Sequence, residues 1–455
     1  MAWIVRLVSV GAEGEEHSTD VLQIARPGDL TELASLGLSM AEGKRLLAGV
    51  QREIVAAQSR VHAVRRPECH GCGTACRVKD YRRHEIATLF GQVAVRLPRF
   101  RCGGCGTIAS GVEWPPHARS TPELDRLRAQ LSALLTYRTA AEVLGQMFPV
   151  DAGTAHETLR RRMFKVAEEL PMPATAQPAT PAEMITVTLD STFIRSCGDG
   201  ERHLEVRIGN VETTGGRRQV FGAVAKTDTD LAALIRGSLE AVGRTETTVL
   251  TAFTDGCPGL RRILLDAGVS GLPTLDWFHL AMRLQHLTQV AGGLSSDGPE
   301  RAAAKAVIVE EVDRLRWRLW NGRAKDAGIS LDRIRAVMPC FQGEPDGRRS
   351  IAPSRKLWTA LQALNDYLVG QSDWLVNYAE RHRAGQRVGT ALTEGTANFL
   401  VNRRMNKMQQ MRWTRRGADR LLQVRRAVYD GALGTGFGQR FQAANDPHQP
   451  VVTAA

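Results

Sequence analysis

The sequence predicts a multidomain α+β protein, and three observations lead to that prediction. Two C-x-x-C pairs flank alternating apolar residues in the first quarter of the chain. Helical periodicity follows them and ends at a proline-rich stretch. Beyond it the pattern changes to short apolar strands, tight turns and helices. A chain of 455 residues is long enough for two to four such domains.

The composition favours a polyanionic partner. The formal net charge is +12 with 43% hydrophobic residues, which indicates a soluble chain that binds nucleic acid or an anionic membrane surface. No apolar run approaches the ~18 residues that cross a bilayer. The start, Met1–Gly11, has too short an apolar part for a signal peptide. We therefore expect a cytoplasmic protein whose partner is DNA or RNA and not a membrane.

Residues 1–65 are expected to form an N-terminal helical region. Apolar residues between Ile4 and Val10 favour a short strand at its start. Ser39 and Glu42 have the spacing of a capping box, and the apolar stripe after them predicts an amphipathic helix to about His62. Packing against the core is the default interpretation of that stripe, ahead of a partner helix.

Residues 66–112 have the pattern of a zinc ribbon. Strands are expected at 86–90 and 93–97, with Gly91-Gln92 between them. A glycine directly follows each C-x-x-C pair and lets the backbone turn tightly. Four thiolates in a tetrahedron suit structural Zn²⁺, with a redox dithiol as the alternative. The expected zinc ligands are Cys69, Cys72, Cys102 and Cys105, and Cys76 is left over. Ten Lys/Arg against three acids between Arg60 and Arg101 favour contact with DNA over a purely structural ribbon.

Residues 118–170 are predicted to form a helix-turn-helix-like DNA-binding domain. A leucine stripe begins after Thr121-Pro122, and a second, basic helix follows the turn at 149–153. Many helical hairpins that bind no DNA share this plan. The side chains expected to face DNA are Arg160, Arg161, Arg162 and Lys165. Residues 171–183 hold four prolines and are interpreted as a semi-rigid linker.

Residues 184–278 predict the first part of an α/β core. Strands are expected at 184–195, 203–211, 218–225, 249–255 and 273–278, with helices at 231–242 and from Pro258. Three antiparallel strands, a helix, and two further parallel strands follow the order of an RNase-H-like fold. In such a sheet the first and fourth strands are neighbours, so Asp190 and Asp255 are expected side by side.

Three acids are the candidate catalytic residues: Asp190 in an apolar strand, Asp255 at a strand end, and Glu394 ahead of a basic tract. A lone Asp at a strand end is commonly a turn former or a helix cap. Two adjacent carboxylates repel, however, unless a hard divalent cation neutralises them. Two ions there suit phosphodiester displacement. His279, three residues after Asp276, is either a satisfied core histidine or a partner of a metal ligand or phosphate.

An all-α insertion is expected over 279–388, with helices at 302–320 and 356–383. Its tryptophans, at 317, 320, 358 and 374, are interpreted as mostly core residues. The core then resumes over 389–430 with a last helix and a basic tract, nine Lys/Arg and one acid from Arg403 to Arg426. The tract is either a solvated face or a phosphate-binding surface beside the acids. Its candidate DNA contacts are Arg403, Arg404, Lys407, Arg412, Trp413, Arg415 and Arg416. Residues 431–455 are expected to be a disordered tail.

Four stretches carry a resemblance to a known family: L-D-S-T from Leu189, F-T-D-G-C-P-G-L-R from Phe253, L-D-W-F-H from Leu275, and E-G-T-A-N-F-L-V-N-R-R from Glu394. Together they resemble the DDE transposases of bacterial insertion sequences, in particular the Kra-type family. The interval between Asp255 and Glu394 is longer than in the simplest members. The tract before Glu394 also lacks a rich glycine-serine run, so Glu380 and Asp276 remain alternative ligands.

The resemblance implies DNA strand cleavage and transfer with two Mg²⁺ ions, for which Mn²⁺ substitutes. Asp190, Asp255 and Glu394 would be the ligands, and His279 would lie beside them. The implied partners are double-stranded DNA, as element ends and target, and a second copy of the chain in a homodimer or higher oligomer at the bacterial nucleoid. Two alternatives stay open: a non-catalytic DNA-binding regulator with a domesticated core, and an RNase-H-like nuclease for branched DNA.

Overall fold

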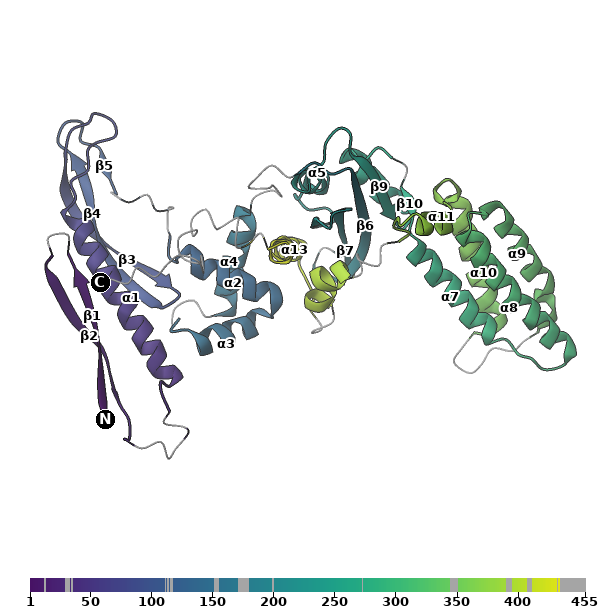
Figure 1. The fold of residues 1–455 in the computed structure, drawn as a ribbon, viewed down its shortest axis with the longest axis horizontal. Coiled ribbons are helices and arrows are strands. Elements are labelled where there is room, and N and C mark those ends of the chain that lie inside the picture. Colours follow the sequence, from purple (N-terminus) through teal and green to yellow (C-terminus); the bar gives the residue numbers. More distant parts are fainter. Residues whose placement is uncertain are drawn as a thin grey trace. The chain divides into compact units, whose positions relative to one another are not determined.

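The protein is described here by a computed structural model, and it mixes helices with antiparallel and parallel strands (Figure 1). The structure describes residues 1–11, 14–28, 33, 36–110, 112, 114, 118–150, 155–170, 180–198, 200–271, 273–343, 351–389, 395–406, 411–431 and 433. The chain divides into two compact units, Met1–Leu170 with Gln423–Ala455, and Pro171–Leu422. Among the described residues, no helix has both the length and the apolar character to cross a bilayer.

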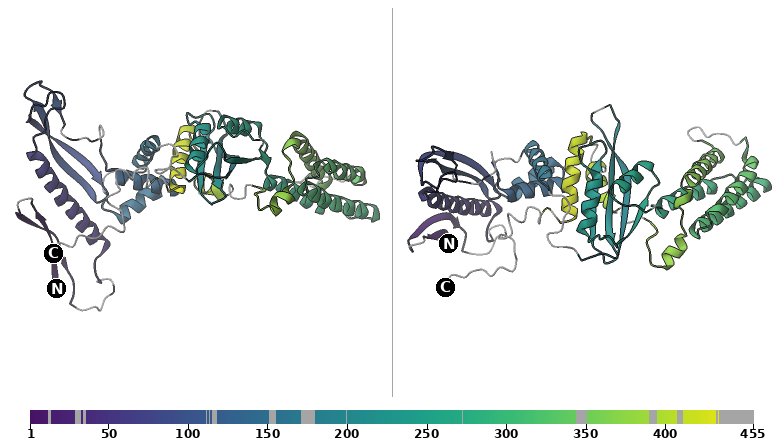
Figure 2. Two further views of the ribbon diagram at one scale, coloured as in Figure 1. Left: turned by 45° about the horizontal axis from the view of Figure 1, so that its top comes forward. Right: turned by 90° about the horizontal axis from the view of Figure 1, so that it is seen from above.

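The N-terminal region is more than helical, which corrects the prediction. Strands β1 (Ala2–Val10) and β2 (Glu16–Ala25) form an antiparallel hairpin. The sequence pattern did not predict β2, because the first five residues of this strand are polar and show no alternation of apolar and polar residues. Helix α1 (Met40–Val64) follows, and its predicted capping box is confirmed: Ser39 caps the helix and Glu42 reaches back to it. In Figure 2, α1 lies between the β1–β2 hairpin and a second hairpin, formed by β3 (Cys76–Thr88) and β4 (Gly91–Cys102).

The second hairpin is longer than its sequence pattern suggested. Strands β3 (Cys76–Thr88) and β4 (Gly91–Cys102) pair along their whole length, and β5 (Ile108–Ala109) adds to β4. The turn lies at residues 89–90, so the prediction of Gly91-Gln92 as the turn is wrong by two positions. Thr88 closes this turn, because its hydroxyl accepts from Phe90 N at 3.1 Å and donates to Gly91 O at 2.7 Å.

Three helices complete the first unit up to residue 170. Helices α2 (Pro122–Leu134), α3 (Tyr137–Met147) and α4 (His156–Glu169) confirm the predicted helical character of this stretch. Buried Leu144 and Leu159 pack α3 and α4 together. Part of the predicted turn, residues 151–154, and most of the predicted linker, 171–179, lie outside the described residues.

A five-stranded mixed sheet is the centre of the second unit. Its order is β10-β9-β6-β7-β8, with β6 antiparallel to β7 and parallel to β9. The strands are β6 (Met184–Arg195), β7 (His203–Thr213), β8 (Arg218–Val224), β9 (Val249–Thr254) and β10 (Thr274–Leu275). The predicted adjacency of the first and fourth strands is confirmed. The fifth strand is shorter than predicted, because Asp276 already caps the next helix.

Helices cover the sheet on both faces. Helix α5 (Leu231–Ala241) packs its buried leucines against Ile185, Val187 and Leu189 of β6, and α6 (Pro258–Asp266) joins the same core. Helix α13 (Arg415–Tyr429) reaches β8 through Asp419, whose carboxylate accepts from Val224 N at 3.0 Å. Before it, η4 (Asn398–Asn406) is a π-helix beside β6, where Asn406 Nδ2 donates to Phe193 O at 3.1 Å.

A helical segment is inserted after β10. It comprises α7 (Trp277–Gly292), α8 (Pro299–Trp320), α9 (Ala324–Val337), α10 (Pro353–Gly370) and the short α11 (Tyr378–Arg383), with 3-10 turns Met338–Phe341 and Ser372–Trp374. Their buried leucines form one core. The stretch 356–383, predicted to be helical, consists of more than one helix. Helix α10 ends at Gly370, and Asn377 caps α11 by accepting from Glu380 N at 3.1 Å.

Candidate functional sites: a four-cysteine centre and a carboxylate cluster

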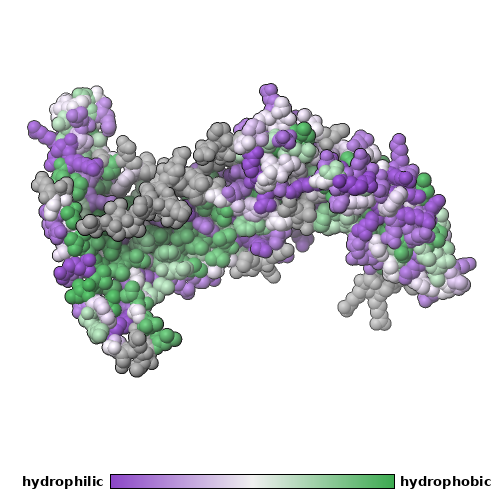
Figure 3. Space-filling view, viewed as in Figure 1, coloured by the Kyte–Doolittle hydropathy of each residue, from purple (hydrophilic) through white to green (hydrophobic). Residues whose placement is uncertain are grey.

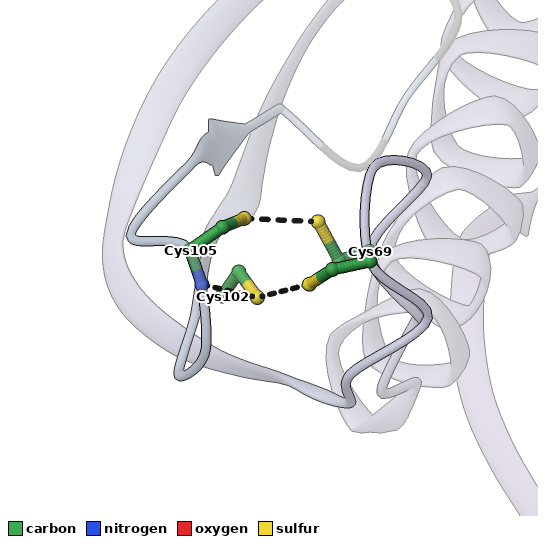
Figure 4. Close-up of side chains that lie close together, drawn as sticks. Cys69, Cys102 and Cys105 are labelled. Carbon is green, nitrogen blue, oxygen red and sulfur yellow. Dashed lines mark hydrogen bonds between the residues drawn. The ribbon is translucent and has the colours of Figure 1, made fainter.

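The first candidate site is a cluster of four thiols at one end of the β3–β4 hairpin. The turn before β3 supplies Cys69 and Cys72, while Cys102 ends β4 and Cys105 lies in the turn after it. The Sγ atoms of Cys69 and Cys105 are 3.5 Å apart, and those of Cys72 and Cys102 are 3.4 Å apart (Figure 4). All four Sγ atoms lie within 4.8 Å of one another. Tetrahedral Zn²⁺ with bonds of about 2.3 Å sets its sulfurs about 3.8 Å apart, so the group fits one zinc ion.

The two cysteine turns are built alike, as the glycines suggested. Gly73 and Gly106 follow the two pairs and have φ of +69° and +74°, a conformation that glycine adopts without strain. Backbone N–H groups point at sulfur, since Gly104 N is 3.3 Å from Cys102 Sγ. Such donors stabilise a thiolate, which is the form that ligates metal.

Threonine hydroxyl groups also stabilise the thiolate form of two of these cysteines. Hydrogen bonding to Thr107 lowers the pKa of the Cys105 thiol to about 6, and hydrogen bonding to Thr74 lowers the pKa of Cys72. Cys76 is different: it is buried at the start of β3, and burial raises the pKa of its thiol. The cluster therefore takes the four predicted cysteines and leaves Cys76 out.

The second candidate site forms where β6 and β9 run side by side. Their parallel register ends with Leu189 opposite Thr254, so Asp190, within β6, and Asp255, the first residue after β9, are the next residues on neighbouring strands. Each is oriented locally: Asp190 Oδ1 accepts from Ser191 N at 2.7 Å, and Asp255 Oδ1 accepts from Cys257 N at 2.9 Å. Burial raises the pKa of Asp255, and the charge of Asp190 raises it further. The two carboxylates are therefore close enough for the charge of one to affect the ionisation of the other.

Asp276 and His279 complete this carboxylate cluster. Asp276 is fully buried and caps α7, with Oδ1 accepting from Phe278 N at 2.8 Å. One turn later, His279 Nε2 lies 3.6 Å from Asp190 Oδ2 and 3.7 Å from Asp276 Oδ2. The nearby carboxylate of Asp190 raises the pKa of His279 despite the partial burial of the ring. Three separate elements therefore bring Asp190, Asp255, Asp276 and His279 together.

Glu394 lies outside the described residues, and so does Lys407. The described chain ahead of Glu394 passes directly beside the cluster. Val388 O accepts from Trp277 N at 3.1 Å, and a Cβ on Gly389 would stand 2.7 Å from Asp276 Oδ1. Glu380, the other alternative ligand, is exposed on α11. Among the described residues, the four cysteines are spaced closely enough to bind one metal ion together. The described carboxylates of the second site lie farther apart than such a group requires.

The helical segment holds the loop that carries Asp255. Tyr367 on α10 donates its hydroxyl to Asp255 O at 3.1 Å, and Gln371 Nε2 donates to Gly256 O at 3.0 Å. Arg261 orients that amide, with Nη2 donating to Gln371 Oε1 at 2.7 Å. Sequence reasoning missed these contacts, because a tyrosine on an amphipathic helix has the pattern of a core residue.

The basic residues predicted on α4 all face carboxylates in their own unit. Glu157 lies 2.7 Å from Arg160 and 3.2 Å from Arg161. Arg162 and Lys165 have longer contacts, 3.6 Å to Asp125 and 3.8 Å to Glu169. Their contact with DNA stays a prediction.

The basic tract near η4 and α13 separates into buried and exposed members. Arg404 and Trp413 are buried, and Trp413 Nε1 donates to Met405 O at 3.1 Å. Arg415 is held by Glu201 at 2.6 Å. The exposed members are Arg403, Arg412 and Arg416. A DNA contact from this tract would therefore come first from the exposed arginines.

No protein-family model matches the chain, and comparison with curated proteins gave no match either. The functional proposal below therefore depends on the sites themselves and on the resemblance of the short stretches described above.

Proposed function

We propose that the protein belongs to the metal-dependent enzymes that cut the phosphodiester backbone of DNA on an RNase-H-like sheet. The observation that carries this proposal is that Asp190 and Asp255 are the next residues beyond the paired part of two parallel strands, with buried Asp276 and half-buried His279 beside them. The strand order β10-β9-β6-β7-β8 supports the same fold class.

Within that class, the function best supported is that of a DDE transposase of a bacterial insertion sequence. It cuts element ends and transfers the freed 3′-hydroxyl to target DNA. The four sequence stretches quoted above support this choice over a general nuclease, and three of them contain cluster residues.

The acid cluster has the donor chemistry that Mg²⁺ or Mn²⁺ requires. Asp190, Asp255 and Glu394 are the proposed ligands, and such ions, when bound, activate water and neutralise phosphate charge. His279 is placed to hold Asp190 or to donate to the scissile phosphate. Asp276 fixes the start of α7 and thereby the position of His279. Tyr367 and Gln371 fix the backbone on either side of Asp255.

Zn²⁺ in the four-cysteine centre would be structural, because all four tetrahedral positions are filled by thiolates. It would stabilise the open end of the arginine-rich β3–β4 hairpin, where β3 begins and β4 ends. We propose that this ribbon and helices α2–α4 recognise double-stranded DNA at the element ends, while exposed Arg403, Arg412 and Arg416 contact DNA nearer to the acids.

A second copy of the chain is the other proposed partner. On α1, apolar residues at heptad spacing remain exposed: Met40 by 62%, Leu47 by 41%, Ile54 by 44% and Val61 by 61%. Apolar side chains also gather over α1 and the β1–β2 hairpin in Figure 3. A stripe repeating every seven residues can pair with a copy of itself, which supports a homodimer or higher oligomer on DNA.

Cleavage and joining of DNA test the proposed function. Purified protein is incubated with labelled duplexes from the flanks of its own gene, with Mg²⁺ or EDTA. We expect nicking and strand joining in Mg²⁺ only, both abolished in Asp190→Ala and Asp255→Ala. Full joining by these two variants would refute the proposal. Cutting of branched DNA without joining would indicate a nuclease instead.

The four-cysteine centre favours one further candidate, a DNA-binding regulator without catalysis. A zinc ribbon binds DNA whether or not the acids hold metal. Tight binding to the flanking duplexes without nicking in either Mg²⁺ or Mn²⁺ would support this function.

A further inference from the structure

A small cationic pocket lies at the far end of β6. It has a volume of about 320 Å³ and is lined by Arg195, Ser196, Arg202, His203 and Arg412. Of these five residues, only Arg412 belongs to the basic tract that the sequence pattern singled out.

The pocket is built by three chain segments that hold one another through backbone hydrogen bonds. Trp413 N donates to Arg195 O at 2.9 Å, and Cys197 N donates to Trp413 O at 3.1 Å. Ser196 N donates to Arg202 O at 3.0 Å and closes the turn between β6 and β7. Because the Trp413 indole is buried and bonded to Met405 O, the segment that carries Arg412 is anchored at its next residue.

Among the residues that the structure describes, no carboxylate pairs with the arginines of this pocket. Within the described part of the chain, the side chains of Arg195, Arg202 and Arg412 have no hydrogen bond or ion pair, and all three are exposed. The adjacent carboxylate, Glu201, is already engaged by Lys226 at 2.6 Å and by Arg415 at 2.6 Å. Three guanidinium groups around one small cavity repel each other, and an anion between them removes that repulsion.

We propose that this pocket binds a phosphate group of a nucleic-acid backbone. Arginine side chains match phosphate oxygens with paired N–H donors, and the Ser196 hydroxyl and His203 ring add polar groups to the lining. The small polar cavity lacks the apolar walls that hold a base or a drug-sized ligand. The proposal deepens the proposed function, on which its biological role rests, by naming a phosphate contact outside the acid cluster.

The position of the pocket fits a nucleic-acid chain that also reaches the acids. Arg195 follows Asp190 on the same strand by five residues, which is about 17 Å at about 3.3 Å per residue. One strand of a duplex places a phosphate every 3.4 Å or so along its axis, so about five steps separate the two sites.

Binding of DNA by the full-length protein tests this proposal. Fluorescence anisotropy of the zinc-loaded protein measures the affinity for a labelled single strand and for a duplex, at several salt concentrations and without added Mg²⁺. The variants are Arg195→Gln, Arg202→Gln and Arg412→Gln. The matched control is Arg316→Gln, an exposed arginine of α8 without a described partner in the same unit. Each pocket variant should weaken binding about three- to tenfold and reduce the slope of log affinity against log salt. The reduction should not exceed about 0.9 for a duplex or about 0.7 for a single strand, the values for the loss of one phosphate contact. The control should change neither.

Inorganic phosphate and pyrophosphate are titrated in parallel to separate a nucleic-acid site from a small-anion site. If these ions bind and the pocket variants lose that binding while DNA affinity and salt slope stay unchanged, the nucleic-acid proposal is overturned. Unchanged binding of every ligand overturns it as well. The outcome is independent of catalysis: wild-type protein that binds through the pocket but never cuts would defeat only the proposed function, and cutting with unaffected pocket variants would defeat only this inference.

Discussion

Replacing Tyr367 with phenylalanine tests how the helical segment supports the acid cluster. The change removes one hydroxyl and leaves the ring, which is packed against Arg283 at 4.1 Å. Asp255 O then loses the donor that lies 3.1 Å away. The loop keeps its second tether, from Gln371 to Gly256 O at 3.0 Å. We therefore expect a shift of the Asp255 loop and not its unfolding.

The size of the effect follows from that single bond. A hydrogen bond to a partly buried carbonyl contributes about 1 kcal/mol, which corresponds to about fivefold in a rate or binding constant. Burial raises the pKa of the Tyr367 hydroxyl to about 12, so it remains a donor throughout the working pH range. The predicted loss is thus independent of pH between neutral and mildly alkaline conditions.

The assay is Mg²⁺-dependent cleavage of labelled DNA, followed as the Mg²⁺ concentration for half-maximal rate. Tyr367→Phe should raise that concentration about fivefold, and the double variant with Gln371→Ala should raise it further. Tyr81→Phe is the matched control, because Tyr81 is exposed on β3. A variant that melts at a lower temperature but keeps the wild-type Mg²⁺ dependence would refute the positioning role and leave Tyr367 a packing residue.

Three further predictions concern the remaining features. Elemental analysis of the full-length protein should find one zinc ion per chain. The Cys102→Ser variant should lose this zinc, and the control variant at exposed Cys197, Cys197→Ser, should keep it. Equal zinc content in the two variants would contradict the four-cysteine site. Glu311 on α8 accepts from Ser330, Arg314 and Arg333, each at 2.8 Å, so Glu311→Gln should destabilise the helical segment by about 3 kcal/mol in denaturant unfolding. Its exposed neighbour offers the control, since Glu310→Gln should cost less than about 1 kcal/mol, and equal losses would rule out the buried network. Bonding to Arg26 lowers the pKa of Glu42 from 4.5 to about 2, so the stability it adds is present above pH 4.5 and is lost as pH falls toward 2. The melting-temperature gap between wild type and Arg26→Gln should close over that interval, and a gap constant with pH would contradict the pair.

Local signals in the sequence predicted those features that depend on a few neighbouring residues. The capping box at Ser39 and Glu42 is one example, and the glycines after each C-x-x-C pair are another. Strand order also followed from the pattern, since β6 and β9 are adjacent as the sequence of strands and helices required. The sequence therefore predicted that Asp190 and Asp255 lie on neighbouring strands.

Features that depend on distant contacts could not be predicted in this way. The polar first half of β2 forms a strand because β1 pairs with it, not because of its own pattern. Arg404 and Trp413 are buried although they belong to a basic tract. Backbone hydrogen bonds hold Trp413 against the end of β6, a contact that the local sequence does not reveal. The pocket around Arg195 is lined by residues from three segments, so no single stretch of the sequence predicts it.

The central claim is that Asp190 and Asp255 together bind divalent ions. Measuring the binding of Mn²⁺ tests this claim without any DNA. Electron paramagnetic resonance of the zinc-loaded full-length protein counts bound Mn²⁺ directly. The predicted result is two sites in wild type that Mg²⁺ displaces, both weakened at least tenfold in Asp190→Asn and in Asp255→Asn, since removing either ligand disrupts the shared site. Unaltered Mn²⁺ binding in both variants would contradict the claim.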